Sequence, residues 1–251
     1  MAGMARTTTP GTAVEQLAGY LLDRGHQDGI AEELTGWLAD SPRFRSFAHV
    51  HRDKIRKKLR TAVDPEALRD VRAELQVARL ILVDPNIELA FEAYGSGKGG
   101  PDLTVTYRGR RSFNLEVTRL RRVPDATGFG PPLLAKLRQL PPSVPNAVLV
   151  AIGGSAAEAL DVAAATRALR ARADVKDETF FDRRGLAGTR GFYERYLRLG
   201  GVLAWCEGAA GDARAALWIN GSARIPLPER DIRAVVRCLR NDDRVVAEVR
   251  A

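Results

Sequence analysis

Apolar residues in the first third of the chain recur with the spacing of a helix. Between residues 11 and 84 they stand three or four positions apart, which places them on one face of each helix. Ser41 and Pro42 predict a helix start, with the serine as N-cap and the proline in the first turn. We therefore expect helices throughout this segment, including one over 42–61 and another that begins after Asp64.

The pattern changes at Asp84, where apolar and polar residues begin to alternate. Strands are predicted over 86–94, 102–107 and 112–120, the last two joined by a tight turn. A continuous apolar run over 146–154 is typical of a strand buried on both faces. Further helices are expected near 133–140, 156–173, 189–199 and 228–240, and further strands over 202–207 and 215–220. Three strands in meander order, then a helix and a buried strand, predict an α/β fold with a mixed sheet flanked by helices.

The expected organisation is an N-terminal helical extension over 1–64, which carries a basic helix, followed by an α/β domain over 65–251. The sequence contains no run of about 18 apolar residues, so no membrane span is predicted. The first residues lack the apolar core of a secretory signal. Cys206 and Cys238 lie far apart, and the three histidines form no HExxH motif. We therefore expect no zinc site, and we expect a cytoplasmic location.

The net charge of +8 is concentrated in two windows. Residues 41–60 carry a net charge of +7 and residues 104–122 one of +5, so the rest of the chain is acidic. This concentration favours a partner that bears phosphates, namely nucleic acid; the alternative is an ordinary solvated helix face. The candidate nucleic-acid contacts are cations of these windows, namely Arg43, Arg45, Arg52, Lys54, Arg56, Lys57, Lys58, Arg60, Arg111 and Arg119.

A glycine-rich segment over 95–100 has the letters of two phosphate-binding motifs without their context. A dinucleotide-binding GxGxxG needs a helix after its glycines, and here a strand is predicted. A Walker A loop needs a glycine where Glu92 stands and a serine or threonine where Gly99 stands. Neither function is expected from this segment.

Three carboxylates stand out by their surroundings. Asp102 opens one predicted strand and Glu116 lies in the apolar centre of the next, so a tight hairpin can bring the two together. A buried charge is costly unless it is paired or bound to a metal, and a shared cation is the simplest explanation of two neighbouring carboxylates. Glu74 interrupts the apolar face of the preceding helix and offers a third donor. Three such oxygen donors suit Mg²⁺ or Mn²⁺.

The order Glu74, Pro101-Asp102, Glu116-Val117-Thr118 resembles the motif of the PD-(D/E)XK nuclease superfamily, whose fold is called restriction-endonuclease-like. The resemblance covers roughly residues 66–155, and the superfamily's αβββαβ core is similar to the element order expected here. It implies a divalent-metal-dependent nuclease with Glu74, Asp102 and Glu116 as metal ligands. Such a metal polarises a phosphodiester and lowers the pKa of a bound water.

The chain departs from the superfamily at Thr118, where the motif has a lysine. A threonine cannot offset transition-state charge as an amine does. Lysine is rare here, at six of the 39 cationic residues, and we expect the amine from Lys136, with Lys98 as the other candidate. In the superfamily the helix that carries Lys136 borders the site, and Gln139 resembles a polar residue often found on it. A surface lysine is the plain alternative.

Each carboxylate also has an ordinary structural interpretation. Asp102 can simply start a strand, and the other two can pair with nearby arginines, Arg108, Arg111 or Arg119 for Glu116 and Arg72 or Arg79 for Glu74. Three hypotheses for the function follow: a metal-dependent nuclease acting on nucleic acid, DNA ahead of RNA; a catalytically silent nuclease-like fold that binds nucleic acid; and a scaffold whose basic helix docks an acidic protein. A homodimer would let two sites cut two strands.

Overall fold

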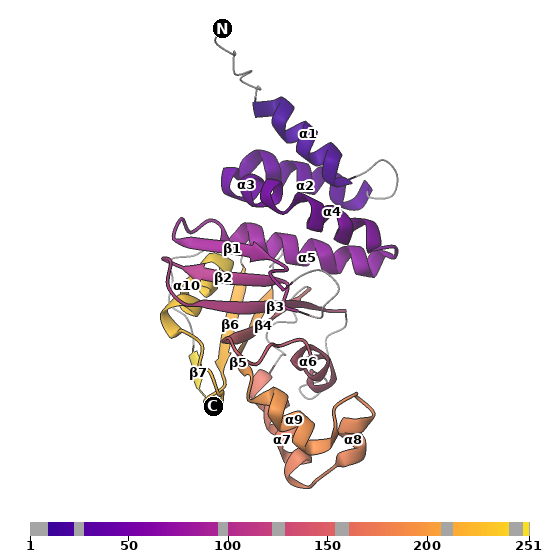
Figure 1. The fold of residues 1–251 in the computed structure, drawn as a ribbon, viewed down its shortest axis with the longest axis vertical. Coiled ribbons are helices and arrows are strands. Elements are labelled where there is room, and N and C mark those ends of the chain that lie inside the picture. Colours follow the sequence, from indigo (N-terminus) through magenta and orange to yellow (C-terminus); the bar gives the residue numbers. More distant parts are fainter. Residues whose placement is uncertain are drawn as a thin grey trace. The chain divides into compact units, whose positions relative to one another are not determined.

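A computed structural model describes residues 10–22, 28–94, 100–121, 129–153, 161–206, 213–240 and 248–250. The chain forms two compact units, Met1–Leu82 and Val83–Ala251 (Figure 1). This division falls later than the expected one at residue 64, and the helix Pro65–Ile81 belongs to the first unit. Side-chain contacts explain the placement, because Arg72 of this helix donates two hydrogen bonds to the Glu33 carboxylate, at 2.6 and 2.5 Å.

The described part of the first unit consists of helices. They are α1 (Pro10–Leu22), α2 (Asp28–Asp40), α3 (Pro42–Val50), α4 (Arg52–Thr61) and α5 (Pro65–Ile81). Each helix contributes fully buried apolar side chains to the core of this unit, among them Leu21, Leu34, Phe44, Ile55 and Leu75. The helical period of the sequence therefore predicted this core correctly.

Two of the predicted helix starts are confirmed at atomic detail. The Ser41 hydroxyl accepts a hydrogen bond from the Phe44 backbone N–H at 3.2 Å, and the Asp64 carboxylate accepts one from that of Ala67 at 2.8 Å, as N-caps do. The single helix expected over 42–61 is wrong in one respect. His51 leaves the helical conformation, with φ −102° and ψ 14°, and its ring packs 4.9 Å from that of Phe47.

The second unit is built on a seven-stranded sheet in the order β1 to β7. Its strands are β1 (Ile87–Phe91), β2 (Leu103–Tyr107), β3 (Ser112–Leu120), β4 (Asn146–Ile152), β5 (Leu199–Cys206), β6 (Arg214–Ile219) and β7 (Glu248–Arg250). The first three strands pair antiparallel, β3 to β5 run parallel, β6 is antiparallel to β5, and β7 is parallel to β6. The expected α/β fold with a mixed sheet is confirmed.

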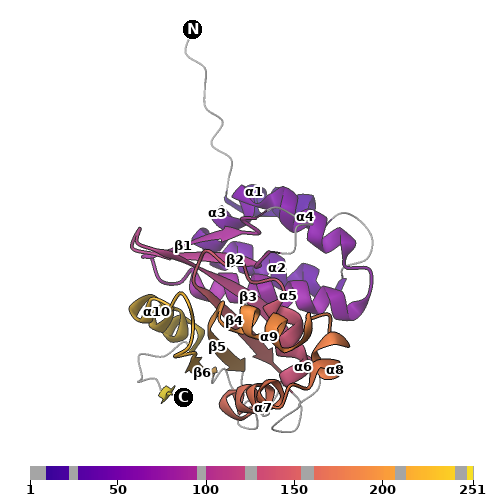
Figure 2. The same ribbon diagram turned by 60° about the horizontal axis from the view of Figure 1, so that its bottom comes forward.

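Helices cover both faces of this sheet. They are α6 (Gly130–Leu137), α7 (Val162–Asp174), α8 (Glu178–Asp182), α9 (Gly188–Tyr196) and α10 (Glu229–Arg240). Residues of α6, α7 and α9 pack in one core with Val148 and Val150 of β4, whereas α10 lies on the opposite side (Figure 2). There the Trp205 indole N–H donates to the Leu239 carbonyl at 3.0 Å. Among the described residues, no helix is long and apolar enough to span a membrane.

The hairpin between β2 and β3 sets the register on which the candidate site depends. Arg108 and Gly109 both have positive φ, 52° and 63°, as the two central residues of a type I′ turn do. The Arg110 N–H donates to the Tyr107 carbonyl at 3.1 Å, which closes the turn. The strands pair Thr106 with Ser112 and, at the far end, Leu103 with Leu115, so the ladder contains one residue more than a two-residue turn requires.

Candidate active site

Asp102 and Glu116 meet where the pairing of β2 and β3 ends. The last pair is Leu103 with Leu115, so Asp102 stands one step further along, across from Glu116. Both residues are buried, with 8% and 2% of their surface exposed. Two carboxylates on adjacent strands in this degree of burial need compensation by donors or cations. The two carboxylate residues of the sequence motif thus lie across from one another on adjacent segments of the chain.

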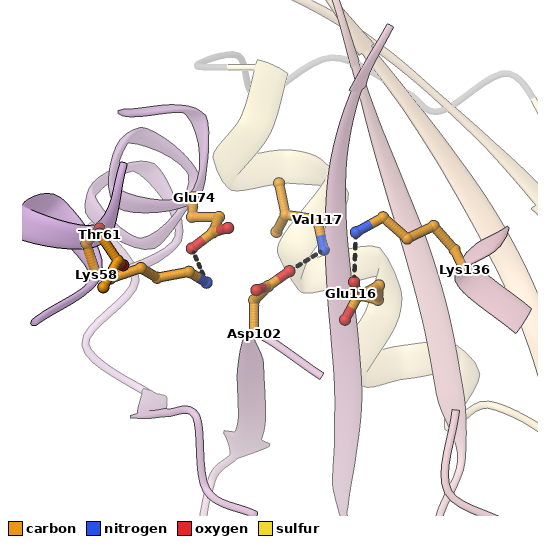
Figure 3. A network of polar contacts seen from close by, with 7 residues as sticks. All are labelled: Lys58, Thr61, Glu74, Asp102, Glu116, Val117 and Lys136. Atoms are coloured by element: carbon orange, nitrogen blue, oxygen red, sulfur yellow. Dashed lines mark hydrogen bonds and ion pairs between the residues drawn. The ribbon is translucent and has the colours of Figure 1, made fainter. Parts of the chain in front are cut away.

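The Asp102 carboxylate is anchored to the backbone of β3. Its Oδ2 accepts a hydrogen bond from the Val117 N–H at 2.9 Å (Figure 3). The Asp102 carbonyl also accepts from the Glu92 N–H, at 2.9 Å, which ties it to the end of β1. The side chain is therefore held within one residue of Glu116, and its ordinary interpretation as a strand-start residue does not by itself account for this reach across the sheet.

The Glu116 carboxylate receives the amine of Lys136. Glu116 pairs in register with Val148 of β4, which belongs to the core beneath α6. The Lys136 Nζ donates to Glu116 Oε1 at 2.6 Å, from the opposite side of β3 to Asp102 in the view of Figure 3. The Lys136 side chain is 23% exposed, so the amine partner of this buried carboxylate is itself partly exposed to solvent. The structure thus brings together three of the residues that the sequence singled out, Asp102, Glu116 and Lys136.

The other residues expected near this amine are placed differently. Thr118 follows Glu116 by two positions on the same face of β3, opposite Val150, and is half-buried. Gln139 was expected on the helix of Lys136, but α6 ends at Leu137 and Gln139 lies in the following turn, where its N–H donates to the Lys136 carbonyl at 3.0 Å. The alternative amine, Lys98, lies outside the described residues.

Glu74 belongs to the first unit, on α5, and is paired there. It is buried, and the Lys58 Nζ of α4 lies 2.5 Å from its Oε2 (Figure 3). The arginines considered as its partners are engaged elsewhere: Arg72 binds Glu33, and the guanidinium of Arg79 lies 5.8 Å from the Trp37 ring. Lys58, expected among the phosphate contacts, therefore compensates a buried carboxylate. The role of Glu74 as a metal ligand remains a prediction.

A buried polar cluster lies next to Glu116 and was not predicted from the sequence. Asn114, two residues before Glu116 on the same strand, accepts from the Thr104 hydroxyl at 3.0 Å and donates to Asn146 Oδ1 at 3.0 Å and the Tyr94 hydroxyl at 3.1 Å. Asn114 and Asn146 are fully buried and pair in register on β3 and β4. An asparagine inside each of two apolar strands was the available signal. The cluster fixes the strands that carry the site.

The candidate nucleic-acid contacts divide between the units. On α4 the basic side chains alternate between exposed and half-buried, with Arg52, Lys57 and Arg60 exposed. Arg45 instead donates to the Leu38 carbonyl at 2.7 Å, which stabilises the end of α2. Arg111 is exposed beside the β2–β3 turn, and Arg119 is half-buried on β3.

The donor set fits a hard divalent cation in its simplest form. In the described part of the chain, no three Asp, Glu, His or Cys side chains gather to hold a metal on their own. Mg²⁺ commonly takes one or two carboxylates and completes its shell with water and substrate phosphate, which Asp102 and Glu116 can supply. No family model matches the chain, and no curated protein or solved structure does so either. The resemblance therefore rests on the residues of the sequence motif.

Proposed function

We propose that this protein is a divalent-metal-dependent nuclease with a restriction-endonuclease-like fold, which hydrolyses phosphodiester bonds in nucleic acid, DNA ahead of RNA. One observation carries the proposal: the buried Asp102 carboxylate accepts from the backbone of β3 next to the buried Glu116, and the Lys136 amine contacts Glu116. Two carboxylates can hold a divalent metal that assists phosphodiester hydrolysis, and an amine can offset negative charge on a phosphate. A cytoplasmic location and a homodimeric state fit this function.

Asp102 and Glu116 would hold Mg²⁺ or Mn²⁺, which when bound polarises the phosphodiester and lowers the pKa of its water. The Val117 N–H keeps the Asp102 carboxylate oriented, so that little reorganisation is needed. Lys136 reaches the site from α6 and supplies the positive charge that Thr118 cannot. It offsets the charge that develops on the phosphate oxygens. The resemblance also implies Glu74 as a metal ligand, and the variant Glu74→Gln tests how much Glu74 contributes to metal-dependent cleavage.

A cleavage assay tests the proposal. Single- and double-stranded DNA and RNA are incubated with no metal, Mg²⁺ or Mn²⁺, and the wild type is compared with Asp102→Ala. We expect the wild type to cleave at least one substrate only when Mg²⁺ or Mn²⁺ is present, and the variant to lose this cleavage. Cleavage that persists in the variant would show a contaminating nuclease or a different site, and would contradict the proposal.

The second candidate is a catalytically silent nuclease-like fold that binds nucleic acid, and Thr118 at the motif lysine position favours it. No cleavage, together with binding that weakens steeply as salt increases, would support this function, because neutralised phosphates release counterions. The third candidate is a scaffold for an acidic protein, and for it we expect no affinity for arbitrary nucleic acid that falls steeply with salt.

A further inference from the structure

A hollow opens on the first unit between α1 and α4. Its volume is about 440 Å³, and it is lined by Tyr20, Asp53, Arg56, Lys57, Arg60 and Thr61. None of these residues belongs to the Asp102–Glu116 pair. The two helices pack against one another, so the walls of the hollow are held by the core of this unit. It therefore constitutes a second place where a ligand can bind.

One wall is an aromatic ring in a fixed position. Tyr20 is 38% exposed, and its hydroxyl donates to Asp53 Oδ1 at 2.5 Å. The guanidinium carbon of Arg56 lies 4.5 Å from the centre of the ring, a cation–π contact. The tyrosine is thus oriented from α4 by a hydrogen bond and a cation. An exposed aromatic ring beside an arginine provides surfaces on which a nucleic-acid base can stack.

The charge of the lining favours a doubly charged anion. Arg56, Lys57 and Arg60 contribute three positive charges and Asp53 one negative charge, which leaves the lining at +2. A phosphodiester carries about one negative charge, whereas a terminal phosphate monoester carries about 1.5 to 2 at pH 7. The hollow therefore matches the charge of a terminal phosphate more closely than that of an internal one. The Thr61 hydroxyl adds a neutral polar group to the same lining.

We propose that this hollow binds the terminal phosphate of a nucleotide, either free or at the end of a strand, with the adjoining base against Tyr20. The side chains of Lys57 and Arg60 would donate charge-assisted hydrogen bonds to the phosphate oxygens. The choice of a strand end as the source of the phosphate rests on the proposed function. The recognition chemistry itself does not depend on cleavage.

Isothermal titration calorimetry in EDTA separates phosphate recognition from cleavage, because no divalent metal is present to support cleavage. The probes are the dinucleotides pTpT and TpT, thymidine 5′-monophosphate, and inorganic phosphate. We expect pTpT to bind at least roughly tenfold more tightly than TpT, since charged hydrogen bonds are worth that factor. Equal affinity for pTpT and TpT would overturn the proposal. Inorganic phosphate binding as tightly as pTpT would overturn the role of the base. Comparing thymidine monophosphate with a long 5′-phosphorylated strand distinguishes a free nucleotide from a strand end.

Variants locate the binding. Lys57→Gln and Arg60→Gln should each remove most of the preference for pTpT, whereas Arg69→Gln, a matched loss of charge on α5 outside the hollow, should keep it. Circular dichroism verifies the fold of each variant. A preference that survives both hollow variants, or is lost equally in Arg69→Gln, would overturn the assignment. Absence of metal-dependent cleavage with retained pTpT preference would refute the nuclease function and leave this site standing.

Discussion

The Lys136 amine lies 2.6 Å from a Glu116 carboxylate that is only 2% exposed. Removal of the amine leaves a buried charge without this cation, which is costlier than removal of both partners. We predict that Lys136→Met lowers the free energy of unfolding by about 1–3 kcal/mol at pH 7. Urea denaturation followed by circular dichroism measures the change.

The double variant Glu116→Gln/Lys136→Met is the control for lost packing. It removes both charges, and we expect it to be more stable than Lys136→Met alone, because the charge that burial penalises is then absent. Additive effects of the two substitutions would show that the ion pair contributes nothing.

Thr118 lies on the face of β3 that also carries Glu116, which makes it a place to return the missing amine. We predict that Lys136→Met reduces metal-dependent cleavage by roughly 100-fold or more, and that adding Thr118→Lys recovers at least roughly tenfold of this loss. The measurement is the initial cleavage rate at saturating metal. Thr118→Lys in the wild-type background is the control. A double variant no more active than Lys136→Met would contradict a shared role for the two positions.

The basic side chains of α3 and α4 predict a steep dependence of nucleic-acid binding on salt. If Arg43 and Lys54 contact phosphates, Arg43→Gln and Lys54→Gln should each lower the slope of log K against log salt concentration by about 1. Fluorescence anisotropy with a labelled duplex between 50 and 300 mM salt provides the slope. Arg190→Gln, on α9 of the second unit, should leave it unchanged. An unaltered slope in the first two variants would exclude these residues from the interface.

Asp231, in the first turn of α10, predicts a pH effect on stability. Burial raises the pKa of its carboxyl above the usual 3.8, while Arg110 and Arg230 act in the opposite direction. The folded protein therefore favours the protonated acid. The stabilisation this provides is complete below the unfolded pKa and is lost as the pH rises through the folded pKa.

Asp231→Asn stays neutral, so it should gain in stability relative to the wild type as the pH rises from 4 to 7. Urea denaturation at several pH values measures this difference. Glu229→Gln, which removes a carboxylate from the same turn, controls for the helix dipole. A difference that is flat or declines with pH would contradict the burial of an ionised Asp231.

Local patterns in the sequence predicted many of the helices and strands. The strand expected over 112–120 has those bounds in the structure, because its apolar positions and the turn before it are encoded within a few residues. Ser41 and Asp64 marked helix starts for the same reason. The helix expected near 133–140 begins earlier, at Gly130, and Pro131 and Pro132 lie in its first turn, where prolines are tolerated.

Contacts between distant residues could not be predicted in the same way. Glu74 pairs with Lys58, sixteen positions earlier, because α4 packs against α5, and no local pattern specifies that packing. The sequence offered Arg108, Arg111 and Arg119 as partners of Glu116, whereas the structure pairs it with Lys136 of α6. The role of Asn114 likewise depends on Asn146 of a different strand.

The measurement that tests the central claim most directly is metal-dependent cleavage by wild type and Asp102→Asn side by side. The asparagine oxygen can still accept the Val117 N–H, so the substitution removes the charge and leaves the fold, with a change in unfolding free energy of less than about 1 kcal/mol. We predict Mg²⁺- or Mn²⁺-dependent cleavage by the wild type and a loss of roughly 100-fold or more in the variant. Equal cleavage by both proteins, or cleavage that persists in EDTA, would contradict a metal site formed by Asp102 and Glu116.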